Sequence, residues 1–76
     1  MNEQILNRVR EIASDVLDAK VDADSSPVTI ESWDSVTHID LMMAIEAEYG
    51  VRFRPAEMED AQSIGQIAAL VASKRA

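Results

Sequence analysis

The sequence predicts an all-α protein, a small four-helix bundle with a long first loop and a short third helix. The chain has only 76 residues, 47% of them apolar, which suits a single domain over residues 1–76 with one thin core. Apolar residues recur at spacings of three and four in three segments, as in amphipathic helices. The strand-like stretch 51–53 is too short to form a sheet without a partner.

The first predicted helix covers residues 3–18, and a long loop follows it over residues 20–33. The loop is rich in Asp and Ser, has no helical period, and is expected to be held to the core by Val28, Ile30 and Trp33. A loop of this length in a small domain is commonly functional or disordered. The apolar stripe of the first helix consists of Ile5, Leu6, Val9, Ile12, Ala13, Val16 and Leu17.

The second predicted helix covers residues 35–49. Asp34 is suited to cap its first turn, and Gly50 can adopt the left-handed conformation that ends a helix. We expect a short helical turn over residues 56–60. The last helix is expected from Ser63 to about Ser73, because Ser63 and Gln66 have the spacing of a capping box before the stripe of Ile64, Ile67, Ala68 and Val71.

Charge is segregated along the chain, which has 7 basic and 14 acidic residues and a net charge of −7. No Lys or Arg lies between Lys20 and Arg52. This acidic middle third would repel nucleic acid and anionic membranes and attract basic protein surfaces, although an acidic surface kept for solubility fits the composition equally well. Its acids are Asp22, Asp24, Glu31, Asp34, Asp40, Glu46 and Glu48.

The chain contains no Cys, so it has no disulfide, no thiolate metal site and no thiol nucleophile of its own. Together with the absence of a signal-peptide pattern and of a membrane-length apolar run, this predicts a soluble cytoplasmic protein without stable membrane insertion.

A calcium site is not expected, although Asp22, Asp24 and Ser26 alternate as they do at the start of a calcium loop. The sixth position of that loop is Pro27, where a sharp turn requires Gly, and the twelfth is Trp33, where a bidentate Glu is required. We therefore predict no metal site.

Ser35 and His38 are three residues apart, the spacing at which a nucleophile and its base could meet on a helix. No third group is evident to orient the imidazole, and no G-x-S-x-G elbow is present, so hydrolase chemistry is disfavoured and we predict no catalytic residue. His38 falls on the core-facing side of the second helix. It is therefore expected to pack near Trp33, in the arrangement of a hydrophobic staple.

The second helix carries two apolar stripes. Leu41, Met42, Ile45 and Tyr49 are sufficient to face the core, which leaves Val36, Ile39 and Met43 on a second side. This second stripe is bordered by Asp40 and Glu46 and lies beside Ser35, so it has the character of a docking face, unless the loop 20–33 covers it.

Ser35 directly follows Asp34, the predicted helix cap. Because Asp34 can cap the helix, the Ser35 hydroxyl is not needed for capping. A helix N-terminus favours an anion, which makes this serine well placed to carry a phosphate.

The run Asp34-Ser35-Val36, continued by THIDLMMAIEAEYG, resembles the 4′-phosphopantetheine attachment region of acyl carrier proteins, with Val36 where the family usually has Leu. The resemblance extends over nearly the whole chain. It implies that a phosphopantetheinyl transferase esterifies Ser35, that Asp34 positions and caps the site, and that the thiol of the arm holds acyl groups as thioesters. The arm would thus supply the thiol that the chain lacks.

The same resemblance implies a partner-contact face. Val36, Ile39 and Met43 would be apolar contacts, and Asp40 and Glu46 would meet basic patches on acyl-transferring, condensing or ligase enzymes, with the carrier itself a monomer.

Thr37 and Ala47 occupy positions that are usually acidic in housekeeping carriers, and Trp33 precedes the Asp. These departures favour an accessory carrier for a polyketide, an aminoacyl group or a modified lipid. A carrier-like module without an arm, or a small acidic enzyme regulator, remains the alternative.

Overall fold

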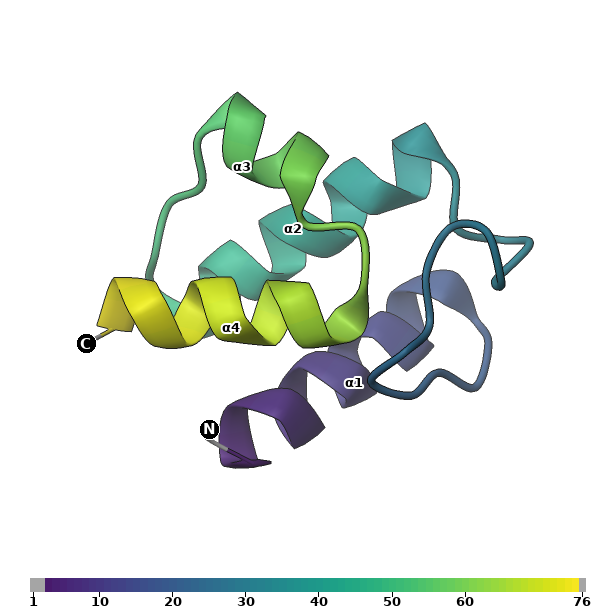
Figure 1. Cartoon of the computed structure of the whole chain (residues 1–76), viewed down its shortest axis with the longest axis horizontal. Helices are drawn as coiled ribbons and strands as arrows, with labels where there is room; N and C mark the ends of the chain where they lie inside the picture. The colour runs from purple at the N-terminus through teal and green to yellow at the C-terminus, as the bar shows by residue number, and fades with distance from the viewer. Residues whose placement is uncertain (1–2, 76) are drawn as a thin grey trace.

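The computed structural model describes residues 3–75, and these form four helices and no strand (Figure 1). The helices are α1 (Glu3–Leu17), α2 (Ser35–Tyr49), α3 (Pro55–Asp60) and α4 (Ile64–Arg75). The predicted four-helix architecture, with its long first loop and short third helix, is confirmed. α2 has its predicted bounds, whereas α1 ends one residue early and α3 begins one residue early. α4 begins one residue late, at Ile64, and continues beyond Ser73 to Arg75.

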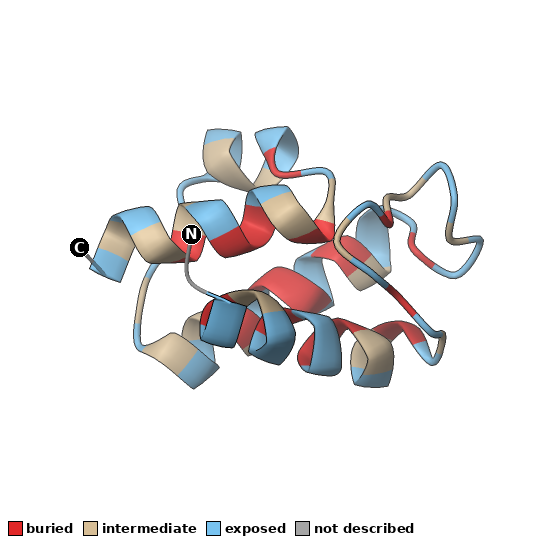
Figure 2. Ribbon diagram, turned by 60° about the horizontal axis from the view of Figure 1, so that its bottom comes forward, coloured by how far each residue is buried: buried red, intermediate tan, exposed pale blue. Residues whose placement is uncertain are grey.

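The core lies where α1 packs against α2 and α4. The buried sides of these helices face one another in Figure 2. The first-helix stripe is confirmed, since Val9 and Ala13 are completely buried and Ile5, Ile12 and Leu17 nearly so. Further buried side chains come from α2, the long loop, the α2–α3 and α3–α4 connections and α4: Leu41, Met42, Ile45, Val21, Trp33, Phe53, Ala61, Ile64, Ile67, Ala68 and Val71.

The loop between α1 and α2 is docked on the bundle, but Val28 does not hold it there. Val28 is 94% exposed, so this prediction was wrong. Ser26 and Thr29 explain the difference, because the Ser26 backbone N–H donates to the Thr29 hydroxyl oxygen and the Thr29 N–H donates to the Ser26 carbonyl. This turn carries Val28 outward at its tip, while Trp33 is buried and Ile30 is partly buried against the core.

The same loop closes the ends of two helices. The Ser32 hydroxyl donates to the carbonyl of Leu17 at the end of α1 (2.7 Å). At the start of α4, the N–H groups of Ile64 and Gly65 donate to the carbonyls of Ser25 (3.2 Å) and Ala23 (3.0 Å). Helix-end backbone groups that lack partners within their own helix are thereby satisfied by the loop.

The other helix ends are set by local signals. Gly50 ends α2 in the left-handed region (φ 63°), and its N–H donates to the Glu46 carbonyl. At α4, Ser63 Oγ accepts the Gln66 N–H (3.1 Å), as the predicted cap requires, but Gln66 Oε1 accepts the N–H of Gln62 rather than that of Ser63.

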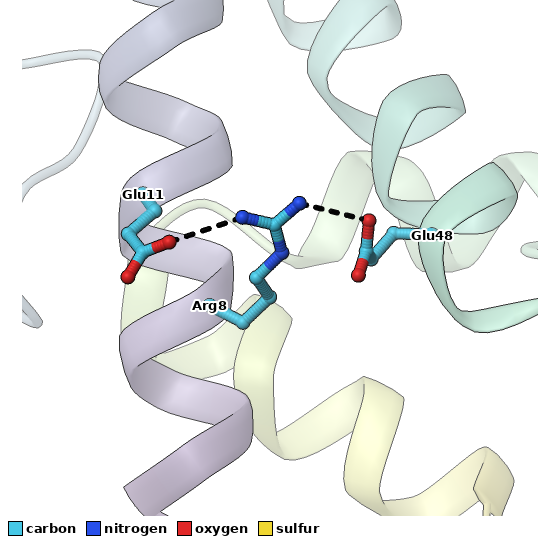
Figure 3. A network of polar contacts seen from close by, with 3 residues as sticks. All are labelled: Arg8, Glu11 and Glu48. Carbon is cyan, nitrogen blue, oxygen red and sulfur yellow. Dashed lines mark hydrogen bonds and ion pairs between the residues drawn. The ribbon is translucent and has the colours of Figure 1, made fainter.

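An exposed ionic contact joins α1 to α2. Arg8 lies 3.0 Å from both Glu11 on its own helix and Glu48 on α2 (Figure 3). Because all three side chains are solvent-accessible, this network contributes little to stability. Within residues 3–75, no helix has the length and apolar character needed to cross a membrane.

Candidate functional site

Ser35 is the first residue of α2, at the end of the bundle where the long loop enters the helix (Figure 1). Its side chain is exposed. Among residues 3–75, no side-chain hydrogen bond uses the Ser35 hydroxyl, although its neighbours Asp34 and Thr37 make several. The hydroxyl is therefore accessible and chemically uncommitted.

Asp34 and Thr37 hold the start of α2 in a reciprocal capping box. Asp34 Oδ1 accepts the N–H groups of Val36 and Thr37, both at 3.0 Å, and the Thr37 hydroxyl oxygen accepts the Asp34 N–H at 2.8 Å. The Thr37 hydroxyl also donates to the Ser32 carbonyl (2.8 Å), which ties the helix start to the loop. In the sequence, Thr37 was notable only because it occupies a position that is usually acidic. In the structure, its hydroxyl group stabilises the start of α2.

This geometry modifies the idea that free N–H groups at the helix start would hold a phosphate. Asp34 already occupies the N–H groups of Val36 and Thr37. Those bonds, the one from Thr37 N–H first, lower the pKa of the Asp34 carboxyl below its ordinary value, so it is ionised at neutral pH. These two N–H groups are therefore not available to an anion at the start of α2.

His38 lies against Trp33, as the sequence predicted, and its ring nitrogens are both engaged. The indole Nε1–H donates to His38 Nδ1 (2.9 Å), and the two rings stack with centroids 5.8 Å apart. Because an indole can only donate, Nδ1 has no hydrogen, and Nε2–H donates to the Met58 carbonyl of α3 (2.6 Å). His38 therefore has no free nitrogen to take a proton from Ser35, and a serine–histidine hydrolase site is not formed.

A groove of about 550 Å³ opens beside Ser35, between the start of α2 and α3. This groove was not predicted from the sequence, because Pro55 and Met58 reach it from a six-residue helix whose position no periodic pattern indicates. The available signal for this short helix was Pro55, which suits the first position of a helix and follows soon after Gly50 at the end of α2. The groove is lined mainly by apolar surface from Pro27, Asp34, Ser35, His38, Ile39, Pro55, Met58, Glu59 and Gln62.

The second apolar stripe of α2 is open to solvent. Val36 is 67% exposed, Ile39 52% and Met43 58%, so the loop does not cover them. Asp40 is exposed on the same helix, whereas Glu46 is only half-exposed and its Oε2 accepts the Phe53 N–H (2.7 Å). Glu46 thus has a structural partner that the sequence did not indicate.

Together these features define a class of protein. It is a small helical domain with an exposed serine at a helix start, whose hydroxyl makes no hydrogen bond within residues 3–75, an apolar groove beside this serine, and an exposed apolar stripe bordered by acidic residues along the same helix. The family model for the phosphopantetheine attachment site matches residues 7–71. An acyl carrier protein of Thermotoga maritima is 32% identical over 79 residues, covering 95% of this chain and 93% of the relative.

The fold agrees with this similarity. The solution NMR structure of holo acyl carrier protein from Geobacter metallireducens superimposes with a TM-score of 0.81 at 27% identity, covering 92% of this chain and 84% of that one. The chain belongs to the acyl carrier protein family, whose members are phosphopantetheine-bearing carriers and not enzymes.

Proposed function

We propose that Ser35 is the attachment residue for 4′-phosphopantetheine. The observation that carries this proposal is the exposed Ser35 hydroxyl, which has no hydrogen-bond partner among residues 3–75 although it sits inside a fully bonded capping box. In the transfer, Ser35 Oγ forms a bond to the phosphorus of coenzyme A that bears the pantetheine, adenosine 3′,5′-bisphosphate leaves, and the hydroxyl proton passes to a base of the transferase.

The bound arm supplies a terminal thiol that carries acyl or aminoacyl groups as thioesters. The chain's own residues prepare the site: Asp34 and Thr37 fix the helix start without using Ser35, so modification does not remove a capping bond. Because the chain has no Cys, the thiol of the arm has no competing thiol in the protein.

The partners we propose are a phosphopantetheinyl transferase and acyl-transferring, condensing or ligase enzymes with basic docking patches, in fatty-acid, polyketide or related lipid biosynthesis. Val36, Ile39 and Met43 provide exposed apolar surface, Asp40 an exposed charge and Glu46 a partly engaged one. We further propose a monomeric cytoplasmic protein that serves as an accessory carrier. Thr37 supports the accessory role, because a capping hydroxyl replaces an acid there.

The test is transfer from coenzyme A by a broad-specificity transferase, followed by intact mass. One phosphopantetheinyl group should add to each wild-type chain and none to Ser35→Ala, while the exposed Ser73→Ala should be modified like the wild type. Circular dichroism should show that Ser35→Ala is folded. A label found on Ser25, Ser26 or Ser63 would show that the site assignment is wrong, and no label at all would favour a carrier-like binding module or regulator without an arm.

A further inference from the structure

The long loop carries an apolar side chain that the rest of residues 3–75 leaves uncovered. Val28 is 94% exposed, the highest fraction among the exposed large apolar side chains of this part of the chain. The others are Val36, Ile39 and Met43, which form the outer stripe of α2. Single exposed apolar residues are common on protein surfaces, so the significance of Val28 depends on where it lies relative to this stripe and to Ser35.

Hydrogen bonds within the loop tip, residues 26–29, hold Val28 outward. The Ser26 carbonyl accepts the N–H groups of Thr29 (3.0 Å) and Ile30 (2.9 Å). The Ser26 N–H donates to the Thr29 hydroxyl oxygen (3.0 Å), and Ser26 Oγ accepts the Val28 N–H (3.3 Å). Because this turn is already formed in the free protein, a partner that contacts Val28 loses little affinity to ordering the loop backbone.

The loop tip lies beside the proposed attachment residue. Pro27, which directly precedes Val28, lines the same groove as Ser35 and Ile39. The loop projects beyond the bundle at the end where α2 begins, and the same projection is seen from a second direction (Figures 1 and 2). Exposed apolar side chains are therefore found near Ser35 on the loop as well as on α2.

We propose that Val28 is a contact for the phosphopantetheinyl transferase that modifies Ser35, and that it enters an apolar recess with a basic rim on that enzyme. The inference rests on the proposed function. The geometry favours the transferase as the occupant because it must bring its own reacting groups to Ser35 Oγ, whereas enzymes that act on the cargo receive it at the far end of the arm. A specific interface covers about 800 Å² on each partner, so a transferase surface placed over Ser35 also reaches the loop tip.

The charge around the loop tip indicates the basic rim. No Lys or Arg occurs between Lys20 and Arg52, and the loop exposes the carboxylates of Asp24 and Glu31. A recess edged by Lys or Arg would bury Val28 and attract these carboxylates at the same time. Complete burial of a valine side chain corresponds to a factor of roughly 10 to 150 in affinity, which is large enough to measure for a single residue.

Steady-state kinetics of modification by a broad-specificity phosphopantetheinyl transferase, with saturating coenzyme A and varied carrier, tests this contact. Val28→Asn removes the apolar side chain and should raise the KM for the carrier at least about tenfold, while kcat changes by less than about twofold. Val28→Ile restores an apolar side chain, so its KM should lie within about threefold of the wild type. The matched control is Ala69→Asn, at an exposed position of α4 that does not line the groove beside Ser35, and its KM should equal that of the wild type.

Binding is separated from chemistry with Ser35→Ala chains, which compete with the wild type for the transferase but cannot be modified. The inhibition constant of the double variant Ser35→Ala/Val28→Asn should exceed that of Ser35→Ala at least about tenfold. The Val28 variants should melt with the wild type in circular dichroism, because this side chain has few contacts to lose.

A Val28→Asn KM within about twofold of the wild type, or a Val28→Ile KM as high as that of Val28→Asn, would overturn this inference and leave the assignment of Ser35 intact. A wild-type chain that is not modified at all would overturn the proposed function and this inference with it. Sedimentation of the wild type as a dimer that Val28→Asn dissociates would show that a second copy covers the loop tip, and this result would also overturn the inference.

Discussion

Leu41 and Met43 are two residues apart on α2, and the structure predicts opposite consequences for their truncation. Leu41 is completely buried among the core side chains, whereas Met43 is 58% exposed on the outer stripe. Leu41→Ala leaves a cavity and should lower the free energy of unfolding by about 2–5 kcal/mol. Met43→Ala removes atoms that are largely in water and should change it by less than about 0.5 kcal/mol.

The loss expected for Leu41→Ala is a large fraction of the total free energy of unfolding. A domain of this length has a total unfolding free energy of about 4–11 kcal/mol, and a change of 1 kcal/mol shifts its melting temperature by about 4–8 °C. Leu41→Ala should therefore lower the melting temperature by at least about 8 °C or unfold the protein. Met43→Ala should stay within about 4 °C of the wild type.

Thermal unfolding followed by far-ultraviolet circular dichroism, with Trp33 fluorescence as a second probe, measures both effects. Met43→Ala should instead weaken association with a partner enzyme, because an exposed methionine is desolvated only in a complex. If Met43→Ala melts as early as Leu41→Ala, this side of α2 is buried in solution. The proposed partner-contact face would then be withdrawn, while the assignment of Ser35 would be unaffected.

Three further predictions concern the backbone and the charges. Asp18 follows the last residue of α1 and has φ 50°, where a side chain is strained, so Asp18→Gly should raise the free energy of unfolding by up to about 1 kcal/mol in urea titrations. Gly50→Ala should lower it by about the same amount, because Gly50 has φ 63°. The folded state lowers the pKa of Asp34, so the contribution of its carboxylate to stability is present above the unfolded pKa of about 3.9 and is lost as pH falls through the lower, folded pKa. The difference in unfolding free energy between the wild type and Asp34→Asn should therefore shrink as pH falls over this interval. A difference that stays constant would contradict the capping geometry. Association rates with a basic transferase should fall steeply as salt is raised through about 0.15 M, where the screening length is roughly 8 Å, and a flat series would argue against steering by the acidic middle third.

The sequence was informative where a helix end carries its own signal. α2 has its predicted bounds because Asp34 caps one end and Gly50 adopts a left-handed conformation at the other, and both signals lie within a turn of the boundary. His38 was placed beside Trp33 for the same reason, since a helical wheel extends over such a short segment with little error.

The sequence was less informative where contacts join distant segments. Val28 was assigned to the core because it is apolar, yet a local turn of Ser26 and Thr29 overrides that preference. Glu46 was read as a surface charge, but its bond to Phe53 N–H depends on how the chain returns after Gly50. The groove likewise depends on the placement of α3, which packing determines and periodicity does not.

The docking of the long loop on α4 has a consequence for anyone who builds chimeric carriers. The loop gives the carbonyls of Ala23 and Ser25 to the first turn of α4, and a Cβ at Gly65 would come within 3.3 Å of the Ala23 oxygen. The segment that leads into Ser35 is therefore fitted to a helix that begins about thirty residues later in the chain. A graft of α2 and its preceding loop into another scaffold should therefore keep a glycine at the position of Gly65, because a side chain there would crowd the loop that leads into the transplanted serine.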